Sequence, residues 1–183
     1  MAEKVKDTQT VKEIVAKFEG VQDAGFDSND IPMIIVPANL IVDVCKFLKE
    51  EKKYDYFNCL TGAEDANYYI SIYNLYAILD YSKRRITVKV NLPKDKPEMP
   101  SVYEVYPAAD WFERESYDLM GIIYKGHPNL KRILTTDDWV GHPCRKDYKI
   151  VEPESYTAIL KAEPDEHVKA GVERTDIFKG FAK

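Results

Sequence analysis

Ionisable side chains that could carry chemistry gather most densely between Trp111 and Tyr148 of this 183-residue chain. The stretch holds six acids and six bases, so it is neutral as a whole. Equal numbers of both signs favour ion pairs within the protein over a surface that binds a charged ligand. The acids are Glu113, Glu115, Asp118, Asp137, Asp138 and Asp147, and the bases are Arg114, Lys125, Lys131, Arg132, Arg145 and Lys146.

Zinc-type ligands occur in the same stretch as His127, His142, Cys144 and the acidic pair Asp137–Asp138. Only a proline separates His142 from Cys144, and no second close pair completes a known zinc spacing. We therefore expect structural histidines that hydrogen-bond to nearby backbone, and no metal site.

Catalytic arrangements are also disfavoured by spacing. Glu113 and Glu115 are two residues apart, so on a helix they point to different faces and cannot act as paired carboxylates. His142 and Cys144 are too close in sequence to converge readily on one substrate atom. The chain has no G-x-G-x-x-G, P-loop or G-x-S-x-G motif. We expect no catalytic or cofactor-binding residue.

A helix must position the first acids of the stretch. Pro107 suits its first turn, Asp110 adds a favourable early charge, and Gly121 predicts a left-handed cap at its end. Helical spacing places Glu115 on an apolar stripe, and a buried carboxylate needs a partner. We expect Glu115 to pair with Arg114, Arg132 or Arg145. The other members of the stripe are Ala108, Trp111, Phe112 and Leu119.

Upstream segments predict the remaining scaffold. Apolar periodicity indicates helices over residues 11–18 and 37–49, and short strands over residues 32–36 and 54–62. Residues 23–30 are expected to form a turn-rich break. Residues 68–79 and 84–92 form a β-hairpin, since the second run alternates apolar and polar residues. These elements predict an α+β domain over residues 1–149: two layers, with a mixed sheet of about four or five strands covered by helices on one face.

Periodicity fades after Tyr148, so residues 150–183 are predicted to form an extended C-terminal tail. Its scattered apolar residues are too sparse for a separate core, and they suit ordering against a partner. Tyr156 and Phe178 are the expected anchors.

Composition narrows the function classes. A net charge of −5 argues against nucleic acid, and so against reading the tyrosine-rich strands as an RNA-binding sheet. No apolar run approaches the roughly 20 residues that span a bilayer, and the N-terminus lacks a secretory signal. We expect an intracellular chain, soluble or attached through a partner.

The three cysteines are widely spaced, which fits a reducing compartment and excludes a self-contained four-cysteine iron–sulfur site. Cys45 and Cys59 are expected to pack as small apolar residues.

Two motifs in the central stretch carry a family resemblance. The first begins E-R-E and continues through an Asp, Gly-Ile, His and a basic–apolar pair. The second reads G-x-P-x-R-K-D-Y. With them, residues 54–148 resemble the C subunit (the thirty-kilodalton subunit) of respiratory complex I, and are especially similar to the J subunit of cyanobacterial and plastid relatives. The residues are Glu113, Arg114, Glu115, Asp118, Gly121, His127 and Arg132, then Gly141, Pro143, Arg145, Lys146 and Asp147.

The resemblance implies a scaffold subunit in the hydrophilic arm of a proton-translocating NAD(P)H- or ferredoxin-quinone oxidoreductase. It implies neighbours of two kinds, the large quinone-site subunit of the forty-nine-kilodalton type and the subunit that carries the terminal iron–sulfur cluster. Clusters and quinone would then lie in these partners, and this chain would lie peripherally on the cytoplasmic side of the inner or thylakoid membrane. The equivalent subunit of a membrane-bound group 4 hydrogenase is the alternative.

Overall fold

The structure is a computed structural model, and it describes residues 7–79 and 83–149. The chain divides after Tyr148 into two units. The predicted tail, with its anchors Tyr156 and Phe178, lies outside the described residues.

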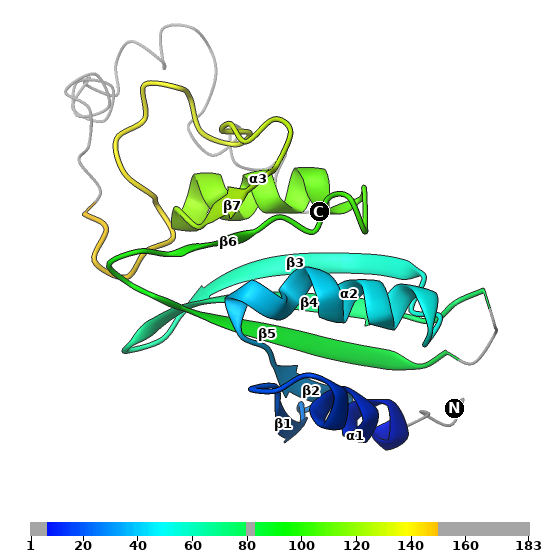
Figure 1. The fold of residues 1–183 in the computed structure, drawn as a ribbon. Helices are drawn as coiled ribbons and strands as arrows, with labels where there is room; N and C mark the ends of the chain where they lie inside the picture. Colours follow the sequence, from blue (N-terminus) through cyan, green and yellow to red (C-terminus); the bar gives the residue numbers. More distant parts are fainter. Residues whose placement is uncertain (1–6, 80–82, 150–183) are drawn as a thin grey trace, which may run out of the picture. The chain divides into compact units, whose positions relative to one another are not determined.

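A five-stranded mixed sheet with the order β1-β2-β5-β4-β3 forms the centre of the first unit (Figure 1). Only the β2–β5 pair is parallel. β4 and β5 pair from Tyr68↔Pro93 to Tyr76↔Arg85, which confirms the predicted hairpin. The strands are β1 (Gln22–Phe26), β2 (Pro32–Ile35), β3 (Tyr56–Glu64), β4 (Tyr68–Tyr76) and β5 (Arg85–Pro93).

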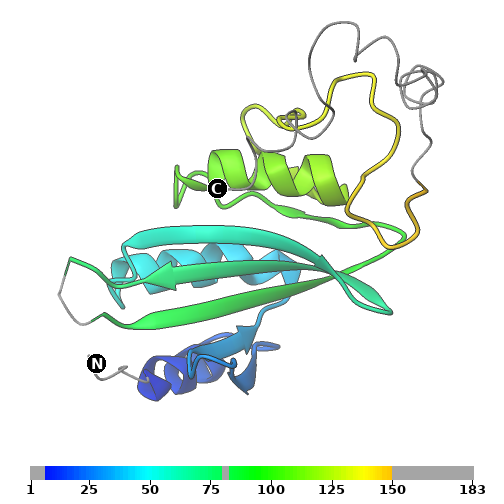
Figure 2. The ribbon, with the colours of Figure 1, turned by 180° about the vertical axis from the view of Figure 1, so that it is seen from behind.

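One face of the sheet forms the core, because successive side chains of each strand point to opposite faces and those on one face are buried. Ile86, Val88, Val90 and Leu92 of β5 are all fully buried, as the alternation predicts. Helices cover this face: in Figure 1, α2 (Ile41–Glu50) stands in front of the strands, and in Figure 2, seen from behind, the strands stand in front of α2. The α+β class with helices on one face is confirmed.

The two N-terminal helices pack on each other at this face. The side chain of Asp7 caps α1 (Thr8–Lys17) by accepting from the backbone nitrogen of Thr10 at 3.0 Å. The rings of Phe18 and Phe47 meet edge to face at 5.7 Å. A 3-10 turn, η1 (Ala38–Leu40), leads into α2, whose Cys45 is fully buried, as expected of a packing residue.

The third helix, α3 (Ala109–Met120), shares the core face with a small parallel sheet of β6 (Glu98–Pro100) and β7 (Ile123–Lys125). Gly62 of β3 permits its close approach, since a Cβ there would lie 2.8 Å from atoms of Met120 and Ser116.

Several sequence-based boundaries differ from the structure. Residues 23–30 were expected to form a turn-rich break, but residues 22–26 form strand β1 and the chain turns only after Phe26. Most of the side chains of β1 are exposed, so backbone pairing with β2 and not apolar patterning defines this strand. β6 lies within residues 93–100, whose three prolines favour a loop over a strand. α3 begins at Ala109, two residues after Pro107.

Within residues 7–79 and 83–149, no helix is both long and apolar enough to cross a bilayer.

Candidate functional site

α3 turns a partly polar face to the core. Ala109, Glu113, Ser116 and Met120 are buried, whereas Glu115 is exposed. The predicted pairing of Glu115 with an arginine is therefore wrong. The predicted stripe fails with it: Trp111 is 63% exposed and Ala108 is exposed too. Apolar periodicity misassigned the buried face because hydrogen bonds allow Glu113 and Ser116 to enter the core.

Glu113 is the buried carboxyl group of the helix, with no exposed surface. It accepts hydrogen bonds from the Ser101 hydroxyl at 2.5 Å and from the Val102 backbone nitrogen at 2.9 Å. Burial raises the pKa of Glu113 to about 7, although these two hydrogen bonds oppose the rise. Near neutral pH the group thus holds a proton part of the time.

His127 lies against the same turn of α3. Its Nε2–H donates to the Asp110 carbonyl at 3.2 Å, and its Nδ1 accepts from the Asn129 backbone nitrogen at 3.1 Å. Nε2 is also 4.0 Å from a carboxyl oxygen of Glu113. As expected of a structural histidine, His127 contacts nearby backbone.

Gly121 ends α3 in the left-handed conformation, with φ of 73°, as predicted. Its backbone nitrogen donates to Tyr117 O at 2.8 Å and closes the last turn. A Cβ at this position would collide with a guanidinium nitrogen of Arg145 and with the ring of His142. Glycine is therefore required here by both backbone conformation and close packing.

Asp118 holds the downstream loop against the C-terminal end of α3. Its fully buried carboxylate accepts from the backbone nitrogens of Ile133, Leu134 and Thr135 at 2.8–3.0 Å, and from the Thr135 hydroxyl. It pairs with the Arg132 guanidinium at 2.7 Å. We call Asp118, Arg132 and residues 133–135 the Asp118 cluster.

Ionisation of Asp118 is favoured within this cluster. Burial opposes its negative charge, but the hydrogen bonds from Thr135 and Ile133 and the Arg132 guanidinium hold the pKa well below its usual range. The carboxylate is therefore charged at neutral pH and fully occupied inside the protein.

Two arginines extend the cluster along the loop. Arg132 also donates to the carbonyls of Trp139 and Gly141, both at 3.0 Å. The predicted partner Arg114 is buried and donates to the carbonyls of Lys131 and Arg132, both at 3.2 Å. The loop thus follows α3 through contacts to its backbone more than through apolar packing.

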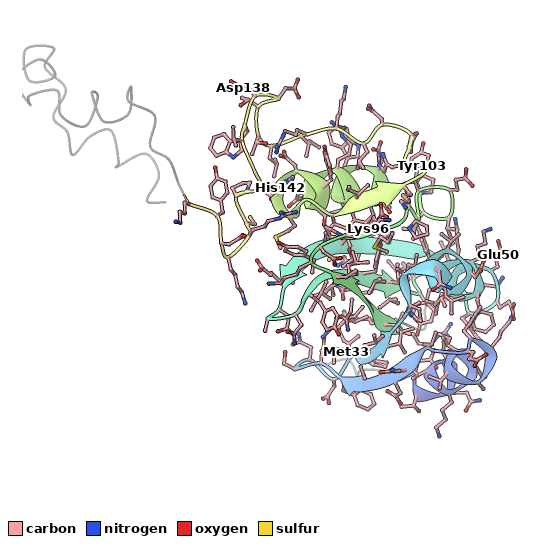
Figure 3. All side chains as sticks on the ribbon, turned by 60° about the vertical axis from the view of Figure 1, so that its left-hand side comes forward. Met33, Glu50, Lys96, Tyr103, Asp138 and His142 are labelled. Carbon is pink, nitrogen blue, oxygen red and sulfur yellow. The ribbon has the colours of Figure 1, made fainter. Side chains whose placement is uncertain are left out.

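The second motif fixes the end of this loop. His142 Nδ1–H donates to the Asp118 carbonyl at 2.9 Å, and Arg145 Nε donates to the Met120 carbonyl at 2.8 Å. The Arg145 guanidinium also stands 4.9 Å from the centre of the Tyr69 ring on β4. Figure 3 shows His142 beside the helix and Asp138 on the outer part of the same loop.

The remaining motif residues have smaller roles in the described structure. The backbone nitrogen of Lys146 donates to Glu64 on β3 at 2.7 Å. Gly141 adopts φ of 82° and passes close to the Tyr148 ring. Pro143 is half-buried, and the Asp147 side chain is exposed.

Among residues 7–79 and 83–149, no three His, Cys, Asp or Glu side chains converge as a metal site. The charges of Asp118 and Arg132 satisfy each other, so the arrangement can hold a loop in a defined shape. The surfaces that this arrangement leaves exposed are the outer face of α3 and the loop over residues 134–140. In that loop Leu134, Trp139 and Val140 are exposed.

The chain matches one protein family over residues 34–154, "Respiratory-chain NADH dehydrogenase, 30 Kd subunit". It belongs to this family. The matched span begins in β2 and includes both motifs, so the Asp118 cluster lies within the region that defines the family.

Curated relatives of this chain are described as the C subunit of NADH-quinone oxidoreductase. The protein from Geotalea uraniireducens (strain Rf4) is 44% identical over 127 residues, which cover 66% of this chain and 74% of that protein. The protein from Chloroherpeton thalassium (strain ATCC 35110 / GB-78) is 43% identical over 108 residues, or 58% of this chain and 45% of that protein.

A solved structure has a similar fold to this chain. A chain of the membrane-bound sulfane sulfur reductase, an archaeal respiratory membrane complex, aligns with a TM-score of 0.67 at 24% identity. The alignment covers 86% of this chain and 92% of that chain. At this identity the similarity concerns the fold alone.

Sequence reasoning missed two features of the site. It did not identify Asp118 as the buried partner of Arg132, and it did not expect Glu113 in the core. The spacing of Glu113 with Ala109, Ser116 and Met120 was an available signal, since it follows the three- and four-residue periodicity of a helix face.

Proposed function

We propose that this chain is a non-catalytic scaffold subunit in the hydrophilic arm of a proton-translocating NAD(P)H- or ferredoxin-quinone oxidoreductase of the complex I type. It braces the large quinone-site subunit of the forty-nine-kilodalton type and the subunit with the terminal iron–sulfur cluster. It binds no cofactor itself, and the clusters and quinone belong to these partners. It lies peripherally on the cytoplasmic side of the inner or thylakoid membrane.

The main support is that the charged side chains of Asp118 and Arg132, two of the motif residues, form their hydrogen bonds with groups of the same chain. The Asp118 carboxylate has five protein hydrogen-bond donors, and the Arg132 guanidinium has four acceptors within 3.0 Å besides a longer contact to Asp118 O. A group so fully occupied is poorly suited to bind substrate or transfer protons, and well suited to fix a surface. Family membership and the names of the relatives supply the host complex.

The motif residues and the C-terminal tail form the contact regions in this proposal. The loop that the Asp118 cluster holds presents one rigid surface to a neighbour. Residues from about 150 onward run along the large quinone-site subunit, with Tyr156 and Phe178 as anchors, because sparse apolar residues gain order from a partner at modest local cost.

Purification of the tagged full chain from its own host tests the proposal. We expect the large quinone-site subunit and the iron–sulfur subunit to co-purify, and the separated chain to contain neither iron nor flavin. Stoichiometric cofactor or turnover in the isolated chain would overturn the scaffold role. Recovery of a hydrogenase large subunit in place of the quinone-site subunit would favour the group 4 hydrogenase alternative.

A further inference from the structure

The face of the sheet opposite the helices carries an ordered pattern of side chains. Strand register aligns them in rows across β3, β4 and β5. The first row is Tyr56, Tyr76 and Arg85, and the central row is Thr61, Ile72 and Lys89. A β-bulge at Phe57–Cys59 brings Cys59 onto this face opposite Asn74. We call the outward side chains of these three strands the outer sheet face.

Apolar and aromatic groups dominate the β4 part of the outer sheet face. An antiparallel sheet with one solvated face usually alternates apolar and polar residues, but here the outward residues of β4 are mainly apolar. Tyr56 is 48% exposed and Tyr68 is 44% exposed. Ile70, Ile72 and Tyr76 are half-buried, and each lies between paired residues of β3 and β5.

Contacts within the face join several of its side chains. Thr87 donates to Asn74 at 2.9 Å, and Asn74 donates to Cys59 at 3.3 Å, so this polar row is satisfied internally. The Tyr56 and Tyr76 rings lie 6.2 Å apart, and the Arg85 guanidinium stands 4.9 Å from the centre of Tyr76. The two rings and the guanidinium therefore contact one another within the chain.

Charge on this face is opposite to that of the whole chain. The net charge is −5, yet Arg85 and Lys89 are the only charged residues among the outward positions of β3, β4 and β5. They border the apolar positions of β4 on the side of β5. A surface that complements this face therefore has an apolar centre and carboxylates along one border.

The size and composition of the face fit a protein interface. Three nine-residue strands, about 3.3 Å per residue and about 4.8 Å apart, cover roughly 400 Å². This area includes the polar outward positions of β5, and the largest apolar patch on a soluble monomer, which is often functional, has a size of the same order. Tyrosine and arginine are enriched where protein partners meet, and a membrane surface would favour more than two cations.

We propose that the outer sheet face docks a partner subunit that presents an apolar segment bordered by carboxylates, which pair with Arg85 and Lys89. The docking deepens the scaffold function proposed above and rests on it. It uses the side of the sheet opposite α3 and the Asp118 cluster, so one chain would contact neighbours through both layers.

Cysteine labelling tests the docking directly. Thr61→Cys places a thiol at an exposed position of the face, in a full-length chain that also carries Cys59→Ser and Cys144→Ser. We expect maleimide to label the isolated chain rapidly and the assembled complex at least about tenfold more slowly, as at a buried interface. Denaturing the complex should restore full labelling.

Four results would overturn the proposal. Labelling that stays fast in the complex excludes docking at this face. Slow labelling of the isolated chain at every concentration would mean that residues 150–183 cover the outer sheet face. Labelling that becomes slower as the chain concentration rises would mean that a second copy covers it. Protection of the isolated chain by vesicles of anionic phospholipid assigns it to a membrane surface. If the wild-type chain recovers no partner subunits at all, the scaffold function itself fails.

Charge reversal tests the pairing with carboxylates. Lys89→Glu should lower the recovery of partner subunits by about tenfold, as expected for loss of an interfacial ion pair. Lys12→Glu makes the same change of charge at an exposed position of α1, and should leave recovery unchanged. Equal losses with both variants would overturn the proposed pairing.

Discussion

Replacing Asp118 with asparagine keeps the shape of the side chain and removes its negative charge. The side chain is fully buried, and its partner Arg132 is 16% exposed, so Arg132 keeps a nearly buried positive charge without a counter-charge. The amide nitrogen of asparagine also cannot accept, so donors on one side of the cluster lose their acceptor. Removing one partner of a buried ion pair costs about 3–5 kcal/mol.

That loss is a large part of the roughly 5–15 kcal/mol that stabilises a typical domain. For a chain of this size it lowers the melting temperature by about 6–20 °C. Urea unfolding of the full-length chain, followed by circular dichroism at neutral pH, measures the loss. Glu115→Gln is the matched control, since it removes the same charge from an exposed position of the same helix. If both variants lose equal stability, the Asp118 cluster does not hold the domain together.

Three further predictions concern pH, packing and the tail. Because the pKa of Glu113 rises from 4.5 to about 7 on folding, the folded state binds more protons between these values. Stability should therefore fall by about 3 kcal/mol as pH rises from 4.5 to 7, and Glu113→Gln should abolish this slope in urea titrations. Gly121→Ala should lower the melting temperature well beyond Gly126→Ala, which has a similar φ of 83° but open space around it; equal shifts would exclude the clash with Arg145. Trypsin should remove residues after Tyr148 quickly from the isolated chain and slowly from the complex, and equal rates would contradict ordering on a partner.

Sequence patterns predicted the parts of the fold that depend on apolar alternation. β5 and α2 bury the residues that their periodicity selects, and Gly121 takes the left-handed conformation that only glycine adopts easily. β1 and β6 could not be predicted in this way. They are short and partly exposed or flanked by proline, and neighbouring backbone rather than their own side chains defines them.

The site was predicted as an internal polar network, but with the wrong centre. Glu115 satisfied the apolar periodicity, whereas the structure buries Glu113 and Asp118. Their burial depends on donors that are distant in sequence, Ser101 on one side and the backbone of residues 133–135 on the other. No local pattern encodes such contacts, because the donors are mostly backbone groups whose position only the folded loop determines.

The order of strands has a consequence for synthesis. β5 is the last strand of the sheet to be translated, yet it lies between β2 and β4. Until it emerges from the ribosome, the β1–β2 and β3–β4 hairpins share no backbone pairing, and β2 and β4 each expose an edge with unpaired backbone groups. Such edges promote aggregation of a nascent chain. The arrival of residues 85–93 covers both edges at once, so this segment converts two separate hairpins into one sheet.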